Sequence, residues 1–275
     1  MPFSQEVWCV LLCPIFCTGW IVSVVTVAKL DRNSEQLETL VRINRGIHAY
    51  QTDGYGRSAF GRGPQTAHDK EKQSYHAQKK LNDTYLPEIK GKDVGRYTST
   101  PTGVFVSYGK WLAEPREPQF FMSPKLAVRK ILGSKLSGTF IAEPTALDQS
   151  LYIAISNSED ETLLKHILGV LLSAIGAWYF RTKYSIYDVL YPWYTKKQLS
   201  QFPIKPKDAR LVRLVDTMLA LNCRLTAVHT DHERTVIHRQ IEATDRQIDK
   251  LVYQLYELTD EEIALVEQTA HKSVE

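Results

Sequence analysis

A short basic segment is the part of the sequence best suited to chemistry with an anion. Residues 85–97 read YLPEIKGKDVGRY and place Lys90, Lys92 and Arg96 within seven positions. The two glycines of this block let the backbone approach a ligand closely, and lysine and arginine neutralise phosphate. Arginine can also hydrogen-bond the edge of a guanine base. The block therefore indicates contact with a polyanion, although a Lys–Asp pair in a turn can equally be structural.

Two other groups of residues suggest metal chemistry. Asp83, Glu88 and Lys90 follow the order of the carboxylates and lysine of metal-dependent nucleases, but their spacing is short and their surroundings are polar. Such matches are common by chance, so a nuclease is a minor alternative. A second group of candidate ligands is more typical of a solvated helix face: His229, Asp231, His232 and His238. We predict neither a metal site nor a catalytic residue.

The motifs of nucleotide-dependent and hydrolytic enzymes are absent from the sequence. No Gly-rich loop follows a strand pattern, which excludes the usual cradles for dinucleotides, S-adenosylmethionine and nucleoside triphosphates. Neither the Asn-Pro-Pro-aromatic tetrapeptide of amino-methylating DNA enzymes nor a G-x-S-x-G elbow occurs. The sequence therefore favours a binding module that holds no cofactor of its own.

Charge is distributed unevenly along the 275 residues. The net charge is +3, but residues 29–135 hold 19 Lys and Arg against 11 Asp and Glu, whereas residues 136–275 hold 15 against 19. A basic first half suggests an anionic partner, and nucleic acid is the main candidate. The composition, with 43% hydrophobic and 24% charged residues, excludes a disordered chain, and four cysteines exclude a disulfide scaffold.

An uncharged segment at residues 7–28 precedes the basic half. A transmembrane helix needs about 20 apolar residues, so this segment is long enough to span a bilayer. Lys29 and Arg32 follow it, and the positive-inside rule would then place the body in the cytoplasm. Cys9, Cys13 and Cys17 lack the spacing of metal ligands. We interpret residues 1–30 as an apolar leader or a transmembrane segment, and a membrane-anchored protein with an unrelated cytoplasmic domain is the alternative function.

The rest of the chain predicts an α+β fold, with a strand-rich body followed by a C-terminal helical hairpin or long helices. Residues 51–85 have no clear period and are expected to be rich in loops. Alternating or continuous apolar runs predict strands at residues 98–110, 127–131, 138–141 and 150–156. A buried helix is expected from residue 159 to about residue 183, followed by an irregular aromatic segment to residue 206.

Helical periodicity dominates the C-terminal region. Asp208 is a helix cap, and apolar residues then recur at spacings of three and four up to Val228 and again from Ile237 to Leu255. The pattern fits one long helix or a hairpin broken near residues 229–232. A capping box at Thr259 and Glu262 predicts a last short helix. The expected divisions are residues 1–30, a body at 31–206 and a helical region at 207–275.

The order of several short segments resembles that of a known family. The segments are RGI at 45–47, the Lys/Tyr/His-rich stretch at 74–83, IKGKDVGRY at 89–97, YGKWL at 108–112, VRKI at 128–131, LDQSLYIAI at 147–155, the helix ILGVLLSAIGAWYFRTKYS, KQL at 197–199, FPI at 202–204 and IDKLVYQLYELT at 248–259. This set resembles the TaqI-like C-terminal specificity domain of adenine-N6 DNA methyltransferases, and especially the C-terminal part of type IIG restriction–modification proteins. The resemblance extends over residues 40–267.

The resemblance implies a target-recognition module that reads a specific DNA duplex. In the family, an associated domain binds S-adenosylmethionine, flips an adenine and methylates it. The sequence holds no motif for that domain or for a nuclease, so we expect a truncated or split chain in the cytoplasm. Its partners would be double-stranded DNA and a separate methyltransferase subunit, and residues 1–28 would then be an unrelated leader. The candidate DNA-binding residues are Arg45, Lys79, Lys80, Lys90, Lys92, Arg96, Lys110, Arg129 and Lys130.

Overall fold

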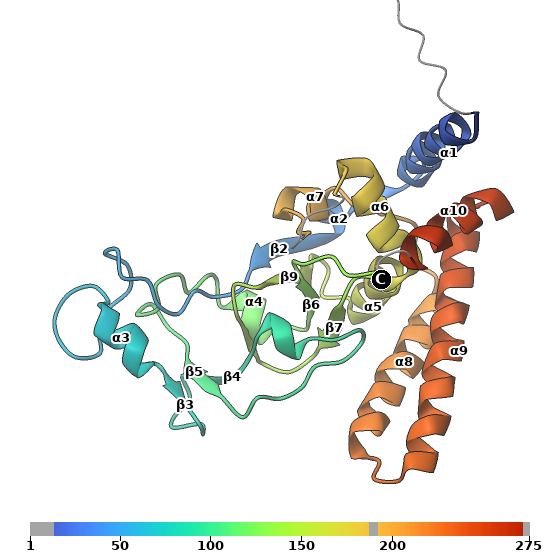
Figure 1. Cartoon of the computed structure of the whole chain (residues 1–275). Helices are drawn as coiled ribbons and strands as arrows, with labels where there is room; N and C mark the ends of the chain where they lie inside the picture. Colours follow the sequence, from blue (N-terminus) through green and yellow to red (C-terminus); the bar gives the residue numbers. More distant parts are fainter. Residues whose placement is uncertain (1–13, 187–191, 272–275) are drawn as a thin grey trace, which may run out of the picture.

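The computed structural model describes residues 14–186 and 192–271 of the chain (Figure 1). Strands and short helices make up the first two thirds, and long helices follow, as the sequence predicted. The elements in chain order are α1 (Pro14–Asp31), β1 (Glu35–Gln36), α2 (Leu37–Leu40), β2 (Val41–Arg45), α3 (Ala67–Lys72), β3 (His76–Ala77), β4 (Tyr85–Ile89), the 3₁₀-helix η1 (Gly91–Asp93), β5 (Phe105–Ser107), α4 (Gln119–Met122), β6 (Lys125–Arg129), β7 (Gly138–Ile141), β8 (Ala146–Leu147), β9 (Leu151–Ser156), α5 (Glu161–Leu172), α6 (Ala174–Tyr184), α7 (Lys196–Ser200), β10 (Pro203–Ile204), α8 (Ala209–Ala227), α9 (Asp231–Leu255) and α10 (Asp260–His271).

An antiparallel sheet of order β2-β9-β6-β7 lies at the centre of the body. Its middle strands are buried on both faces, which explains why β9 reads as the continuous apolar run LYIAIS. Tyr152 and Ala154 of β9 face the core beneath the helices, whereas Leu151, Ile153 and Ile155 face a second core. Because side chains alternate along a strand, this one sheet separates the two cores.

A smaller sheet of order β3-β5-β4-β8 covers the second core. Its strands are short, and β4 pairs with β8 in parallel, with Glu88 opposite Ala146 and Ile89 opposite Leu147. This pairing brings the basic block at residues 89–97 next to the start of β9. The loop-rich segment at residues 51–85 holds only α3, β3 and the beginning of β4 within the described structure, in agreement with its lack of periodicity.

The predicted single helix at residues 159–183 is two helices, α5 and α6, which meet at an angle of 64°. Asp160 caps α5 by accepting hydrogen bonds from the backbone N–H groups of Thr162 and Leu163. Ser173 has an extended backbone between the two helices and its own side chain does not cap α6. The carboxylate of Asp249, in α9, instead accepts the N–H of Ala174 at 2.8 Å. The bend between α5 and α6 is thus stabilised by Asp249, which lies 75 positions after Ala174.

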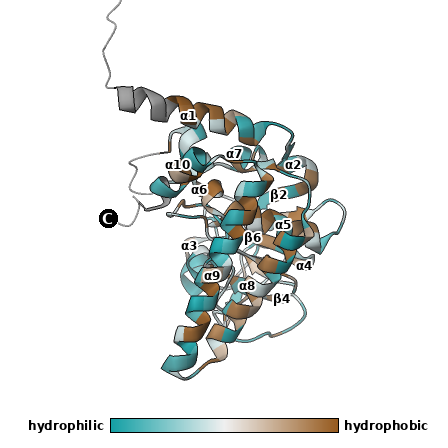
Figure 2. Cartoon of the chain, turned by 90° about the vertical axis from the view of Figure 1, so that its right-hand side faces the viewer, coloured by the Kyte–Doolittle hydropathy of each residue, from teal (hydrophilic) through white to brown (hydrophobic). Residues whose placement is uncertain are grey.

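Helices α8 and α9 form the predicted hairpin and project from the body (Figures 1 and 2). Thr230 caps α9 after a break at residues 228–230, close to the position where the sequence placed it. The apolar face of α8, with Leu211, Val215 and Met218, belongs to the same core as the central sheet. The helical region at 207–275 therefore shares the core of the body at 31–206, and residue 206 is not a boundary between separate cores.

The C-terminal part of α1 is built into the same core. Leu30 is fully buried, and Tyr179 in α6 donates a hydrogen bond of 2.7 Å to Asp31. Lys29 forms an ion pair with the buried Glu262 of α10 at 2.8 Å, and Thr26 contacts the other oxygen of the same carboxylate. Residues 26–31 are therefore packed against the body, on both sides of the division that the sequence analysis placed at residue 30.

The candidate membrane segment at residues 7–28 lies partly outside the described residues, since the description begins at Pro14. Among the helices that the structure describes, none alone has the length and hydropathy of a membrane span. Taken together as one bent segment, α5 and α6 do reach the length and hydropathy of a membrane span, by length and composition alone.

Candidate nucleic-acid interface

The ends of three strands meet at the 148–150 turn, which precedes β9. Arg45, the last residue of β2, lies opposite Tyr152 of β9, and Arg129, the last residue of β6, lies opposite Leu151. The backbone N–H of Lys130 contacts the carbonyl oxygen of Ser150 at 3.4 Å. Strand register therefore brings three of the predicted DNA-binding cations to one end of the central sheet, with Arg45 on the face of Tyr152 and Arg129 on the face of Leu151.

Lys90 joins these residues from the smaller sheet. The backbone N–H of Asp148 donates to the carbonyl oxygen of Ile89 at 3.1 Å, and the N–H of Gly91 donates to the hydroxyl of Ser150 at 2.7 Å. These bonds hold the residues on both sides of Lys90 against the 148–150 turn. A Cβ at Gly91 would lie 2.5 Å from the Ser150 hydroxyl, so glycine is needed for this approach. We call Arg45, Lys90, Arg129 and Lys130 the sheet-end cluster.

The sheet-end cluster has few acidic partners. Within the described part of the chain, the side chains of Arg45 and Arg129 have no hydrogen-bond or ion-pair partner. The Lys130 ammonium lies 5.1 Å from the centre of the Tyr152 ring and donates to the carbonyl oxygen of Gln149. Burial lowers the pKa of Lys130, and the nearby positive charges of Arg45 and Arg116 lower it further, against the negative charge of Asp148, which raises it. A bound anion would relieve this repulsion.

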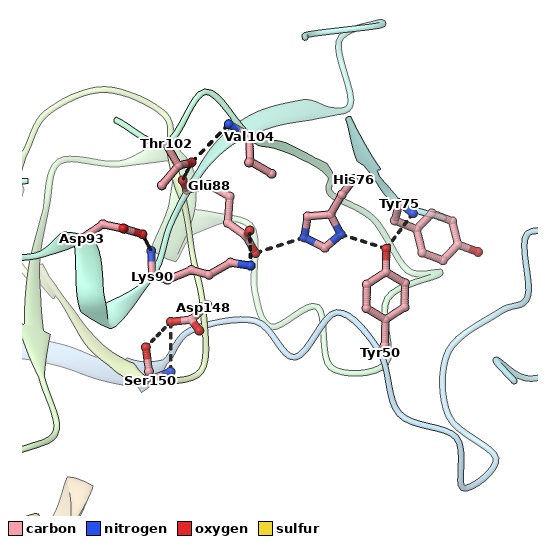
Figure 3. Close-up of polar contacts among 10 residues, drawn as sticks. All are labelled: Tyr50, Tyr75, His76, Glu88, Lys90, Asp93, Thr102, Val104, Asp148 and Ser150. Atoms are coloured by element: carbon pink, nitrogen blue, oxygen red, sulfur yellow. Dashed lines mark hydrogen bonds and ion pairs between the residues drawn. The ribbon is translucent and has the colours of Figure 1, made fainter. Parts of the chain in front are cut away.

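A chain of buried polar groups supports Lys90 (Figure 3). The Tyr50 hydroxyl lies 2.8 Å from Nδ1 of His76, and Nε2 of His76 lies 3.2 Å from Oε1 of Glu88. The Lys90 ammonium lies 3.2 Å from Oε2 of Glu88, within ion-pair range but without hydrogen-bond geometry. Glu88 is 3% exposed, whereas Lys90 is 38% exposed. The buried carboxylate thus holds the ammonium group of a lysine whose side chain is partly exposed.

The charge of Glu88 is stabilised by its neighbours. Burial alone raises the pKa of this carboxyl group, but the hydrogen bond from His76 and the charges of His76 and Lys90 outweigh burial and lower the pKa below its usual range. A cleft of about 170 Å³ opens beside the network. Its polar lining includes Lys70, Gln73, His76, Glu88, Lys90 and Asp148.

The Glu88→Gln variant is expected to lower the free energy of unfolding by about 1–3 kcal/mol at pH 7, because a charged hydrogen-bond acceptor is lost. The folded-state pKa of Glu88 is below its unfolded value, so this stability is present above the unfolded pKa and is lost as the pH falls through the folded pKa. Urea unfolding at several pH values should therefore show the difference from wild type shrinking in acid.

Glu117→Gln is the matched control, because Glu117 forms an ion pair with Arg42 and is 62% exposed. Exposed pairs contribute about 0–1 kcal/mol. An equal effect of both variants, or a Glu88→Gln difference that does not change with pH, would show that the buried network does not stabilise Lys90.

The structure places the other predicted residues separately from the sheet-end cluster or in other roles. Lys79, Lys80 and Lys110 are exposed on loops beside the smaller sheet, and Lys80 lies 3.5 Å from Asp83. Lys92 is exposed in η1, two residues after Lys90. These residues add positive charge without sharing the contacts of the 148–150 turn.

Arg96 is directed toward the helices. Its guanidinium forms an ion pair with Asp245 of α9 and donates a hydrogen bond of 2.6 Å to the carbonyl oxygen of Leu172 in α5. Lys135 lies 2.8 Å from the same Asp245 carboxylate. Arg96 therefore links the body to the hairpin, and a charge reversal at this position would disturb the packing as well as any contact with DNA.

Sequence reasoning did not single out several residues of the site. Arg116 lowers the pKa of Lys130 by its charge, and it was not among the candidate residues that the sequence indicated. His76 and Tyr50 have no motif, since their link to Glu88 depends on the pairing of β3 with β5 and of β5 with β4. The 148–150 turn was part of the segment LDQSLYIAI, but only the fold shows that it joins the two sheets.

The metal-dependent alternatives find no geometry to support them. Asp83 is fully exposed, whereas Glu88 is buried and paired with His76 and Lys90. Across residues 14–186 and 192–271, no three His, Cys, Asp or Glu side chains are grouped as ligands for a metal ion.

Similar proteins of known structure belong to restriction–modification systems. The type IIL enzyme MmeI, solved in complex with DNA, is 10% identical with a TM-score of 0.47, and the match covers 88% of this chain and 37% of that one. The HsdS subunit of Thermoanaerobacter tengcongensis is 14% identical with a TM-score of 0.36, and the match covers 94% and 53%. A chain of a type I system is 14% identical with a TM-score of 0.37, over 94% and 54%. The chain thus spans between about a third and a half of these proteins.

The sequence itself matches one family model. No curated protein sequence matches the chain. Residues 86–204, from β4 to β10, match the model of the TaqI-like C-terminal specificity domain. This segment contains Lys90, Arg129, Lys130 and the 148–150 turn. Over these residues the chain is therefore similar to a TaqI-like C-terminal specificity domain.

Proposed function

We propose that the chain is a target-recognition module of a restriction–modification system and that it binds a specific DNA duplex through the sheet-end cluster. The single observation that carries this proposal is the convergence of Arg45, Arg129 and Lys130 on the 148–150 turn with Lys90 beside them. Two of the four cations have no protein partner among the described residues. The family assignment supports the same function, since specificity domains select the target of such systems.

The cluster is suited to holding the backbone of a duplex. Lysine and arginine that lack acidic partners can neutralise phosphates and release counterions. Because β2 and β6 fix the backbone of Arg45 and Arg129, the conformational entropy lost there on binding is that of the side chains alone. Phosphate contacts set the position of a protein on DNA, and base contacts then supply specificity. Arg45 and Arg129, whose guanidinium groups have no partner within residues 14–186 and 192–271, are the candidates for reading a guanine edge.

We infer further that the module directs a separate adenine-N6 methyltransferase, as the resemblance to type IIG proteins suggests. The methyl donor S-adenosylmethionine would bind that partner. The sequence carries no motif for this cofactor, and the described residues hold no group of three His, Cys, Asp or Glu side chains that could bind a metal ion. A binding role without catalysis therefore fits the chemistry of the site.

Selection from a pool of random-sequence duplexes tests this function. The full-length chain is incubated with the pool at low salt, bound duplexes are recovered and sequenced, and the cycle is repeated. We expect one short consensus to be enriched, with binding to it at least about 1000-fold tighter than to unrelated duplex. Recovery of duplexes without a shared sequence would contradict target recognition.

A further inference from the structure

The region next to the sheet-end cluster holds the most exposed large apolar side chain in the described structure. Trp193 is 60% exposed, and Ile131 beside it is 42% exposed. Most other aromatic residues of the body lie in one of the two cores, so the exposure of a tryptophan calls for a physical reason.

The backbone holds Trp193 firmly in this exposed position. Ile131 and Trp193 form an antiparallel bridge, and the N–H of Leu132 donates to the carbonyl oxygen of Pro192 at 2.7 Å. Tyr194, the next residue, is fully buried, and its hydroxyl donates to the carbonyl oxygen of Arg129 at 2.7 Å. Because neighbouring residues of an extended segment point to opposite faces, burial of Tyr194 directs Trp193 outward.

The apolar pair is continuous with positive charge. Residues opposite each other in an antiparallel bridge share a face, so Ile131 and Trp193 lie on one face, and Ile131 directly follows Arg129 and Lys130 in the chain. Lys196 and Lys197 are exposed at the start of α7, three and four residues after Trp193. An apolar surface surrounded by lysine and arginine complements a polyanion that has apolar groups between its charges, and duplex DNA has stacked bases between its phosphates.

We propose that Trp193 and Ile131 form an apolar wedge that contacts the base pairs of the bound duplex, while the sheet-end cluster holds the adjacent phosphates. This inference rests on the proposed function and adds a base-contacting element to it. Apolar side chains that insert between base pairs unstack them, and aromatic rings stack on any base. A rigid backbone is required for this role, because the wedge must not fold back onto the protein.

The test uses the full-length chain, the selected duplex and a series of salt concentrations. Trp193→Ala is expected to weaken binding about tenfold or more, in line with the loss of one base–aromatic contact, without a change in the salt slope. Trp193→Phe should restore most of the affinity. Val236→Ala, which changes an exposed apolar residue on α9, is the control and should bind as wild type does.

A second readout detects the wedge directly. In duplexes that carry 2-aminopurine at successive positions, the wild-type chain should increase fluorescence at one step, because unstacking relieves quenching, and Trp193→Ala should not. If Trp193→Ala binds the duplex with the affinity of wild type and gives the same fluorescence, the wedge is overturned. The exposed Trp193 and Ile131 would then be assigned to contact with a protein. Absence of duplex binding by the wild-type chain would overturn the proposed function together with the wedge, so the two failures are distinguishable.

Discussion

Replacement of both Arg45 and Lys130 by glutamine is expected to weaken binding of the selected duplex by about 100-fold at low salt, since each charged contact contributes about 1.5–3 kcal/mol. The slope of log K against log salt should become less steep by about 2, because two phosphate contacts are lost. Neither substitution breaks an ion pair in the described structure, since Arg45 has none and the ammonium of Lys130 donates to a backbone carbonyl and lies over the Tyr152 ring.

The control for this variant is Arg239→Gln, at an exposed position of α9 without an ion pair among the described residues. This change removes one unit of positive charge away from the sheet-end cluster and should leave both affinity and salt slope close to wild type. Fluorescence anisotropy with labelled duplex measures both quantities. The single variants Arg45→Gln and Lys130→Gln are measured beside it. If Arg239→Gln weakens duplex binding as much as either of them, the net charge of the protein attracts DNA and the sheet-end cluster is not a binding site.

The Asp249→Ala variant is expected to lose about 2–4 kcal/mol of stability, because the N–H of Ala174 loses its only capping partner in the described structure and Lys135 loses one of its two carboxylates. Asp249 lies in α9, so the loss should also loosen the hairpin from the bend between α5 and α6. Thermal and urea unfolding measure the change.

Asp249→Asn separates the capping role from the charge. Burial raises the pKa of Asp249, so the ionised form is not favoured by its surroundings, and an asparagine oxygen can accept the same N–H. We expect this variant to keep most of the stability that Asp249→Ala loses. If both variants are equally destabilised, the ion pair with Lys135 and not the cap fixes the bend.

Local patterns in the sequence were sufficient to predict many of the helices and strands. The apolar run of β9, the alternation around β5 and the repeats of α8 and α9 each depend on neighbouring residues, and all appear in the structure close to the predicted positions. The bend at Ser173 did not appear in the prediction, because no proline or glycine occupies it and its stabilising cap comes from Asp249. The packing of Lys29 against the body did not appear in the prediction for a similar reason, since its partner Glu262 lies near the other end of the chain.

The candidate site could be predicted only in part. Residue type identified Arg45, Lys90, Arg129 and Lys130 as basic, but only the register of β2, β9 and β6 and the pairing of β4 with β8 bring them together. Residue type also suggested Arg96, whose guanidinium is paired with Asp245, 149 positions away. Charge in a sequence therefore indicates candidates, and long-range partners decide which of them remain free to bind a ligand.

The salt dependence of binding to the selected duplex and to an unrelated duplex tests the central claim most directly. Both plots of log K against log salt should be linear with negative slopes, and the selected duplex should bind more tightly at every salt concentration. This combination requires phosphate contacts together with base recognition. Binding that does not weaken with salt, or equal affinity for the two duplexes, would contradict the assignment of the sheet-end cluster to sequence-specific DNA recognition.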